Sequence, residues 1–305
     1  MRERILQQVL NEMRVARGRE EREAEFRKNA AFRIADISSA QKAYTDALYN
    51  SFLHRKKDAP EVERLHEEYK SALAAHGYSE QDFQAAHVCP ECGGKGIVNG
   101  EPCKCIRDDF VKALGRECGI DPEGFSLEDF DASAIKDAAQ SESLSKIYSL
   151  MSRYVNLYPN VKLRTLVFMG KTGTGKTMLA EAMVRSAVKR GYSALFLTAM
   201  NFNNLMLACH TSPYTERESI IHDVMNADLL VLDDLGTEPR LKNVTCEYLL
   251  LTLEERAAKK HTTVITSNFT SDDFISHYNE RIYSRIFDKR TSLSHTFTGD
   301  DLRTV

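Results

Sequence analysis

Apolar residues recur at helical spacing through roughly the first quarter of the chain. Ile5, Val9 and Leu10 share one helix face, and the same spacing returns in two later segments, from Tyr44 to Phe52 and from Val62 to Leu73. No strand pattern interrupts these segments. The pattern therefore predicts an all-α module.

The segment Arg14–Lys28 of this module is dense in charges of both signs. Such a run is typical of a solvated helix face with ion pairs one turn apart, and we prefer this interpretation to a nucleic-acid-binding arm.

From Phe125 onward, short apolar runs alternate with helical patterns of about 10–18 residues, notably Lys176–Arg190 and Val244–Lys260. The apolar runs predict four strands: Leu163–Met169, Ser193–Thr198, Leu229–Asp233 and Thr262–Thr266. Strands and helices that alternate in this way predict an α/β domain, with a parallel sheet covered by helices.

Between these regions lie a cysteine-rich segment, a short predicted helix over Arg107–Cys118 and a linker at Gly119–Gly124. The chain is thus expected to have three parts. Residues 1–86 form the helical module, 87–124 the cysteine knot and linker, and 125–305 the α/β domain.

Composition narrows the class of protein. A length of 305 residues is enough for about two domains, and a hydrophobic content of 42% can fill their cores. The formal charge of −3 gives no overall positive field that would attract nucleic acid. Four of the seven cysteines fall within Cys89–Cys105, which favours a metal site in a reducing compartment over a disulfide framework. No apolar run approaches the roughly 18 residues that cross a bilayer, and no signal core follows Met1. A soluble, cytoplasmic protein with no membrane partner is expected.

A glycine-rich loop joins the first predicted strand of the α/β domain to its helix. It reads Gly170-Lys171-Thr172-Gly173-Thr174-Gly175-Lys176-Thr177 and follows Leu166–Met169 directly. The strand–loop–helix context identifies a P-loop, whose backbone amides wrap phosphates at a helix N-terminus. Lys176 would reach the β- and γ-phosphates of ATP, and the Thr177 hydroxyl would bind Mg²⁺. The predicted nucleotide-binding residues are Gly170, Thr172, Gly173, Thr174, Gly175, Lys176, Thr177 and Met178.

Two carboxylates end the strand Leu229–Asp233. Four apolar residues before them predict a strand buried on both faces. Asp233 is placed to hold the magnesium ion, and Asp234 to orient the attacking water. Capping of the following loop at Leu235-Gly236 is the alternative role for Asp234.

The next strand ends at Asn268, whose amide could contact the γ-phosphate or merely form a turn. A P-loop, an Asp-Asp strand and an Asn-ended strand in this order resemble an AAA+ ATPase, and the resemblance implies a sensor-1 role for Asn268. It also implies that an arginine of the segment Glu280–Phe287 reaches a neighbouring subunit's ATP. Such a residue is called an arginine finger; Arg285 is the preferred candidate and Arg281 the second choice. The structural alternative is a surface ion pair between Glu280 and an arginine. Arg303, in Gly299-Asp300-Asp301-Leu302-Arg303, resembles a sensor-2 arginine.

The cysteines follow the pattern C-x2-C, ten residues, then C-x-C: Cys89, Cys92, Cys103 and Cys105. Two chelating pairs separated by a glycine-rich turn predict a closed, structural zinc site. Redox use of the first pair is a weaker alternative, since a catalytic C-x-x-C normally opens a helix. His87 could replace one thiolate, whereas Cys118, Cys209 and Cys246 are expected to be packing residues.

The segment His76–Ser79, the cysteine knot, the segment Phe125–Asp131 and the ATPase motifs together resemble bacterial replicative helicase loaders of the DnaC/DnaI type. The resemblance implies that the helical, zinc-containing N-terminal module binds the hexameric replicative DNA helicase. It also implies that the AAA+ domain binds ATP and single-stranded DNA and self-associates, so that the helicase is delivered onto DNA. Asp234 stands where most AAA+ proteins carry Glu, and this shorter side chain suggests slow hydrolysis that serves as a switch.

Contacts with DNA are expected from Asn201–Arg217, with Phe202, Tyr214 and Arg217 available for stacking and phosphate contact. Two other functions remain open on the sequence alone. One is an IstB-type transposition helper ATPase that acts with a transposase on duplex DNA, and the other is an adaptor that binds ATP without hydrolysing it.

Overall fold

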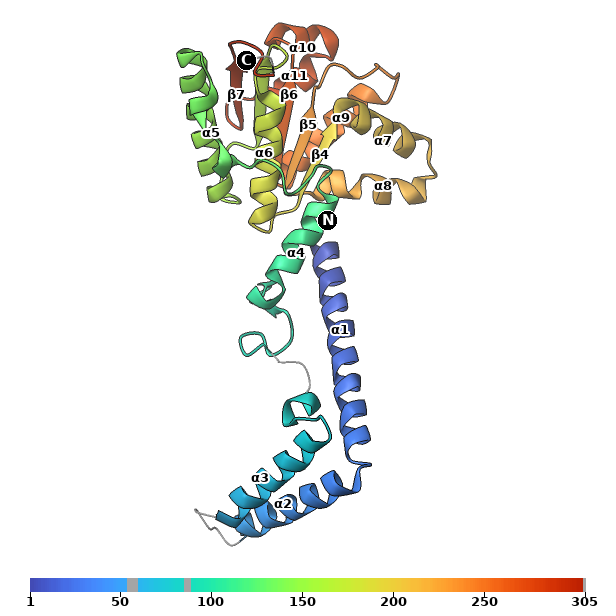
Figure 1. Cartoon of the computed structure of the whole chain (residues 1–305). Coiled ribbons are helices and arrows are strands. Elements are labelled where there is room, and N and C mark those ends of the chain that lie inside the picture. Colours follow the sequence, from blue (N-terminus) through green and yellow to red (C-terminus); the bar gives the residue numbers. More distant parts are fainter. Residues whose placement is uncertain (54–59, 85–88, 304–305) are drawn as a thin grey trace. The chain divides into compact units, whose positions relative to one another are not determined.

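The computed structural model describes residues 1–53, 60–84 and 89–303. It divides into two compact units, Gln8–Ile106 (the N-terminal unit) and Met1–Gln7 with Arg107–Val305 (the sheet unit) (Figure 1). Two helices have residues in both units. The domain boundaries at 86/87 and 124/125 that the sequence suggests stay predictions, and each unit is described separately below.

The N-terminal unit is helical, as expected. Its helices are α1 (Arg2–Ala31), α2 (Ala35–Leu53) and α3 (Pro60–Ala75), followed by the short 3₁₀ helix η1 (Glu80–Phe83). α2 and α3 pack together around a small core of Ala31, Ile37, Tyr69 and Leu73.

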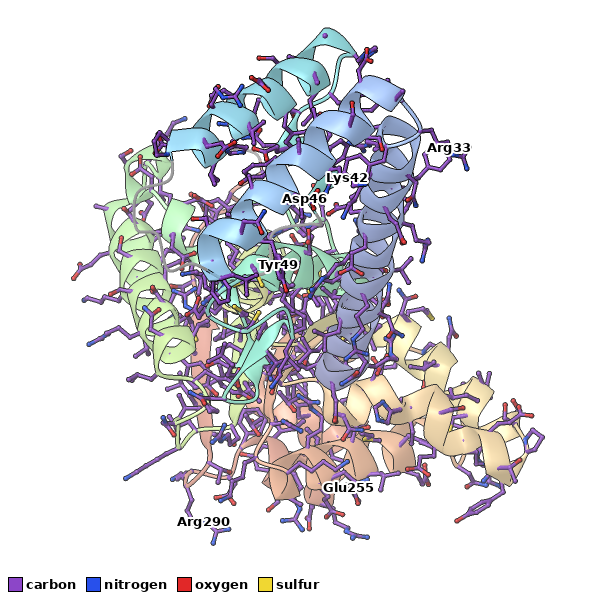
Figure 2. All side chains as sticks on the ribbon, turned by 90° about the horizontal axis from the view of Figure 1, so that it is seen from below. Arg33, Lys42, Asp46, Tyr49, Glu255 and Arg290 are labelled. Carbon is purple, nitrogen blue, oxygen red and sulfur yellow. The ribbon has the colours of Figure 1, made fainter. Side chains whose placement is uncertain are left out.

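Aromatic stacking extends this core, because the Tyr44 ring lies 4.6 Å from the His66 ring and 6.1 Å from the Tyr69 ring. The exposed face of α2 carries polar residues together with large apolar ones, among them Leu48 and Phe52. Lys42, Asp46 and Tyr49 follow one another along it at helical spacing and are exposed (Figure 2).

The cysteine-rich segment forms a small hairpin. β1 (Ile97–Val98) pairs antiparallel with β2 (Glu101–Pro102), and α4 (Lys104–Glu117) follows. Gly96, at φ +75°, packs so closely on α1 that an added Cβ would meet the side chains of Leu10 and Met13. The chain needs glycine here both for the left-handed backbone and for the close approach to α1.

A five-stranded, wholly parallel sheet organises the other unit. Its strands are β3 (Thr165–Gly170), β4 (Ala194–Thr198), β5 (Leu229–Asp233), β6 (Thr262–Ser267) and β7 (Ser292–Phe297), in the order β4-β5-β6-β3-β7. The four predicted strands are present, and β7 is an additional edge strand. Because β6 lies between β5 and β3, the ends of these three strands meet at one edge of the sheet.

Helices cover both faces of this sheet, so the predicted α/β class is confirmed (Figure 1). Val167, Leu230 and Ile265 face a core shared with α7, α9, α10 and α11. On the opposite face α6 packs on the sheet and contacts α5. The bounds are η2 (Leu127–Asp129), η3 (Ala132–Ala134), α5 (Ala138–Leu157), α6 (Lys176–Lys189), α7 (Ala199–Thr211), α8 (Tyr214–Asn226), α9 (Thr245–Ala258), α10 (Ser271–His277) and α11 (Glu280–Ile286).

The segment that follows α4 is part of this sheet unit. The Phe196 amide on edge strand β4 donates to the Cys118 carbonyl at 2.8 Å, and the Arg185 guanidinium donates to the carbonyls of Asp121 and Phe125. The first of these bonds satisfies a backbone amide that an open sheet edge would otherwise leave to solvent, and the bonds from Arg185 hold the segment against α6.

In the part of the chain that the structure describes, no helix combines the length and the apolar character that a membrane crossing would require.

Candidate nucleotide site and metal centre

The phosphate-binding loop is shaped by glycines in left-handed or otherwise strained backbone conformations. Gly173 and Gly175 have φ of +82° and +103°, and Gly175 is the N-cap of α6. A Cβ on Gly170, at φ +137°, would collide with the Phe297 carbonyl of β7. The loop therefore turns tightly from β3 into α6 and leaves the helix N-terminus open to a phosphate group.

Lys176 lies buried beneath this loop. Its Nζ donates to the carbonyls of Gly170 and Lys171 at 2.8 and 2.7 Å and to Asn268 Oδ1 at 2.9 Å. Burial lowers the pKa of Lys176, while the nearby Asp234 and Asp233 oppose that shift. The structure thus brings Asn268, 92 residues away in sequence, next to the P-loop lysine.

Asp233 ends β5 as a buried carboxylate. Its Oδ1 accepts hydrogen bonds from the hydroxyls of Thr177 at 3.0 Å and Thr266 at 2.7 Å. Burial raises the pKa of Asp233, and the two hydroxyl donors only partly offset that effect. A hydroxyl and a carboxylate side by side are oxygen ligands of the kind that Mg²⁺ prefers, directly or through its waters.

Asp234 leaves the strand in a left-handed conformation, at φ +57°. Its amide donates to Thr266 Oγ1 at 2.9 Å and its carbonyl accepts from Thr237 Oγ1 at 2.8 Å. Thr266 therefore holds both carboxylate residues in place, Asp233 by its side chain and Asp234 by its backbone.

The segment after β7 returns across the phosphate loop. The Leu302 amide donates to the Gly173 carbonyl at 2.9 Å, and a Cβ on Gly173 would strike the Asp301 carboxylate. Buried Gln140 on α5 holds this segment by two bonds to the Asp300 backbone. Arg303 lies beside the loop but is paired with Asp301 at 3.0 Å.

The two candidate finger arginines lie on α11. Both are exposed, whereas Ile282 and Ile286 of the same helix are buried. Arg285 pairs with Glu254 of α9 at 2.9 Å, so its partner within the chain is not Glu280. Since exposed pairs of this kind contribute little to stability, Arg285 could exchange Glu254 for another anion at low cost.

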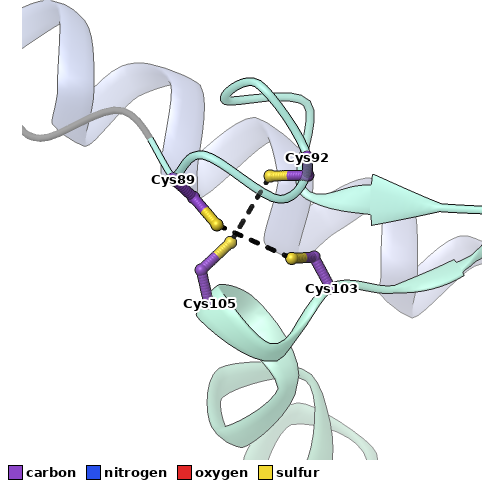
Figure 3. A group of neighbouring side chains, drawn as sticks. All are labelled: Cys89, Cys92, Cys103 and Cys105. Atoms are coloured by element: carbon purple, nitrogen blue, oxygen red, sulfur yellow. Dashed lines mark hydrogen bonds between the residues drawn. The ribbon is translucent and has the colours of Figure 1, made fainter.

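The four predicted metal ligands converge. All four sulfur atoms lie within 4.8 Å of one another, with Cys89 and Cys103 at 3.8 Å and Cys92 and Cys105 at 3.7 Å (Figure 3). Those distances exceed a disulfide bond of about 2.05 Å but match the roughly 3.8 Å edge of a zinc–sulfur tetrahedron with bonds of about 2.3 Å. The four side chains fit a zinc ion.

Hydrogen bonding also favours a thiolate in this cluster. The Gly96 amide donates to Cys92 Sγ at 3.3 Å, and this bond chiefly lowers the pKa of Cys92 to about 7. In contrast, burial raises the pKa of Cys105 to about 12, so a bound cation would be needed to hold all four sulfurs as thiolates. His87 lies outside the described residues.

Residues 122–300, more than half of the chain, match the family described as "IstB-like ATP binding protein". The chain belongs to this family. Membership in the IstB-like family confirms the predicted ATP-binding domain.

Among curated relatives, "Replicative helicase loader DnaC" of Escherichia coli K12 is 27% identical over 159 residues, which is 52% of this chain and 62% of that protein. The protein of the same name from Buchnera aphidicola subsp. Acyrthosiphon pisum is 31% identical over 162 residues, with 52% and 63% covered. A solved structure titled "Crystal structure of the DnaC helicase loader" is 23% identical with a TM-score of 0.47, covering 57% of this chain and 97% of that one. The names confirm the predicted resemblance to helicase loaders, although the match spans only about three fifths of the length of the curated relatives.

The expected DNA-contacting residues of this IstB-like chain differ in exposure. Phe202 is buried in the core. The Arg217 guanidinium, on α8, donates to the carbonyls of Ser212 and of His210 near the end of α7. Tyr214 is 87% exposed and remains available. Of the other cysteines, Cys118 and Cys209 are buried and Cys246 is half-buried.

Sequence reasoning missed three polar residues in or beside the nucleotide site: Thr266, Gln140 and Glu238, whose carboxylate accepts the Gly236 amide two residues after Asp234. Thr266 stands inside a predicted strand and Gln140 inside a helix, so no local motif marks either of them. Glu238 follows the Asp-Asp pair closely, and this proximity was the one available signal.

Proposed function

We propose that this chain is an ATP-dependent loader that binds the hexameric replicative DNA helicase and delivers it onto single-stranded DNA. The observation that carries the proposal is the match of about half of the chain to proteins named replicative helicase loader, together with a family match that includes the phosphate loop, Asp233, Asp234 and Asn268. The same relatives favour a loader over a transposition helper that acts with a transposase on duplex DNA.

Each residue of the site has a proposed role in hydrolysis of ATP to ADP and phosphate. Thr177 and Asp233 would hold Mg²⁺, which would supply positive charge against the phosphates of ATP. Lys176 and Asn268, already hydrogen-bonded to each other, turn to the γ-phosphate when it arrives. Asp234 orients the attacking water and accepts its proton.

Two arginines complete this proposed site. Arg303 leaves Asp301 to contact the phosphates of its own subunit's ATP. Arg285, with Arg281 beside it on α11, reaches the ATP of a neighbouring copy, where a fixed guanidinium stabilises the charge of the transition state. The chain would therefore hydrolyse ATP only when copies associate through their sheet units.

The helical module is proposed to bind the helicase, and the four cysteines to hold one structural zinc ion that fixes the hairpin against α1. ATP binding and slow hydrolysis would act as the switch that releases the helicase on single-stranded DNA.

A loading assay with the full chain tests this proposal. The host's replicative helicase is incubated with the chain, ATP and circular single-stranded DNA, and DNA-bound helicase is counted. We expect capture of the helicase by the chain and ATP-dependent loading, with loading lost in Lys176→Ala although capture persists. Capture of a transposase in place of the helicase would instead establish the transposition function.

Arginine variants then test hydrolysis across the subunit interface. Arg285→Ala should reduce turnover in the assembled state by about 10³-fold without weakening nucleotide binding. Unchanged turnover would show that hydrolysis does not use this residue.

A further inference from the structure

A buried carboxylate joins the loop after Asp234 to the segment that leads into α11. Glu238, 5% exposed, uses its two oxygens for different elements. Oε2 accepts the Gly236 amide at 2.8 Å, and Oε1 accepts a short hydrogen bond from the Tyr278 hydroxyl. A buried carboxylate is costly unless donors satisfy it, so this arrangement fixes both donors strongly.

On the loop side, the Glu238 bond defines the chain immediately after the proposed catalytic Asp234. Gly236, at φ +108°, has the Phe269 ring where a Cβ would stand, and Thr237 donates back to the Asp234 carbonyl. The Asp234 amide also donates a hydrogen bond to the Thr266 hydroxyl, so hydrogen bonds hold the loop on both sides of its turn. Movement of Glu238 would thus move the Asp234 backbone.

On the helix side, Tyr278 stands between α10 and α11. It is 4% exposed, and burial together with the Glu238 carboxylate raises the pKa of its hydroxyl, which keeps the proton that it donates. The next residue, Asn279, caps α11 by accepting the Ile282 amide at 2.9 Å. A bond that fixes Tyr278 therefore fixes the start of the helix that carries Arg281 and Arg285.

We propose that the Glu238–Tyr278 hydrogen bond is a positioning contact that couples the two halves of the ATPase chemistry: the water-orienting Asp234 of one site and the arginines that α11 offers to the neighbouring site. The inference rests on the proposed function. Neither Glu238 nor Tyr278 touches nucleotide in this scheme, since both act through the residues that they hold. A shift in either element would be transmitted to the other. The position of Asp234 at the subunit's own ATP and the position of the arginines that it offers to its neighbour would therefore change together.

The direct test removes one hydroxyl. Tyr278→Phe keeps the ring in the core but leaves Glu238 Oε1 without its donor. We expect kcat for ATP in the assembled state to fall about tenfold, with KM and nucleotide affinity unchanged. Tyr283→Phe is the matched control, because it removes from α11 a hydroxyl that forms no hydrogen bond within the described residues, and it should leave kcat unchanged. An equal kcat in Tyr278→Phe and the control would overturn the coupling.

Mixed assemblies separate the two sides of the contact. Asp234→Asn chains cannot hydrolyse but can donate Arg285, and Arg285→Ala chains can hydrolyse but cannot donate, so mixing them should restore turnover. Adding Tyr278→Phe to the Asp234→Asn chain tests whether that chain still offers Arg285 correctly. Adding it to the Arg285→Ala chain tests whether that chain still positions Asp234 correctly. The coupling predicts a severalfold loss in each case, and a loss on one side alone would contradict it.

These outcomes distinguish the present inference from the function on which it rests. If the unaltered pair does not restore turnover, the proposed hydrolysis across subunits fails and the coupling fails with it. If the pair works and Tyr278→Phe is neutral on either side, only the coupling is wrong. Hydrogen exchange adds a readout without catalysis, because Tyr278→Phe should speed exchange both at the Gly236 amide and in α11, whereas faster exchange in one segment only would refute the link.

Discussion

At the scale of single residues, Asp233 is a site where burial lowers the stability of the nucleotide-free protein, and we propose that metal binding offsets this loss. Its carboxylate is buried, and its pKa is raised chiefly because burial disfavours the charged form. The folded chain therefore binds a proton on Asp233 at a higher pH than the unfolded chain does. Above this raised pKa the ionised carboxylate opposes folding, and the penalty disappears as pH falls through the folded pKa toward the unfolded one.

Asp233→Asn is accordingly expected to raise the Tm of the nucleotide-free protein near neutral pH. The amide oxygen can still accept the bonds from Thr177 and Thr266, but it carries no charge to desolvate. The gain over the wild type should be largest near pH 7 and shrink as the pH falls toward 4. Thermal unfolding followed by circular dichroism between these pH values measures it.

The exposed Asp46 on α2 provides the control, since Asp46→Asn should not reproduce the effect (Figure 2). With Mg²⁺ and ATP present, the wild type should have the higher Tm of the two proteins, because only the wild type gains stability from the bound ion. A lower Tm for Asp233→Asn at pH 7 without nucleotide would contradict this account.

At the scale of elements, Arg256 connects α9 to its neighbours from inside the core. The side chain is fully buried, and its guanidinium donates to the carbonyls of Val224, Ala227 and Thr262 and to the Thr263 hydroxyl. It thereby joins α9 to the end of α8 and the start of β6. Each acceptor would lose its partner if the guanidinium were removed.

We predict that Arg256→Met destabilises the protein by about 3 kcal/mol, because the apolar side chain fills part of the space but leaves buried acceptors unsatisfied. In a domain of this size the loss corresponds to a Tm lower by roughly 6–12 °C. Urea unfolding measures it. Glu255→Met is the matched control, since Glu255 is exposed on the same helix (Figure 2), and a comparable loss there would indicate a helix effect rather than lost hydrogen bonds.

The cysteine hairpin is the element whose fold should depend on metal. We predict about one zinc ion per chain in the purified protein, held by four thiolates. Chelation, or the double variant Cys89→Ser with Cys92→Ser, should release it and expose residues 89–105 to limited proteolysis. Elemental analysis and mass spectrometry of the digest measure both effects.

Cys246→Ser serves as the control, because Cys246 lies on α9 outside the cluster and should leave the metal content unchanged. The zinc assignment is wrong if the double variant keeps its metal or if the wild type contains none.

At the scale of the whole molecule, the features predicted from sequence are those encoded locally. Short, strongly apolar runs in the sequence predict β3, β4, β5 and β6. The P-loop and the cysteine pairs are predicted from their fixed residue spacing. β7 was missed because Ser292–Phe297 is an edge strand with four polar residues on a half-exposed surface. The contacts of Gln140 with Asp300 and of Glu238 with Tyr278 bridge 160 and 40 residues, and no local pattern reports such pairs.

The start of the ATP-binding domain, which stays a prediction, is subject to the same limit. The glycine-rich segment Gly119–Gly124 predicts a start at residue 125. In the structure, Cys118 just before this segment accepts the Phe196 amide of edge strand β4, and Asp121 within it accepts a hydrogen bond from Arg185. Phe110 and Leu114 of α4 are also buried. A glycine such as Gly119 is needed there for close approach to Phe196 rather than for freedom of movement.

A fragment of residues 107–305 should therefore be more stable than one of residues 125–305, although both contain every predicted nucleotide-site residue. The shorter fragment loses the partner of the Phe196 amide, one acceptor of Arg185 and the apolar surface that α4 covers. We expect a difference of about 2 kcal/mol, or roughly 4–8 °C in Tm, from thermal unfolding of the two fragments side by side. ATP binding should be similar in both, because the phosphate loop lies in β3 and α6. Equal melting would instead place the boundary at residue 125, and the segment 107–124 would then serve as a connection that the ATP-binding domain does not need.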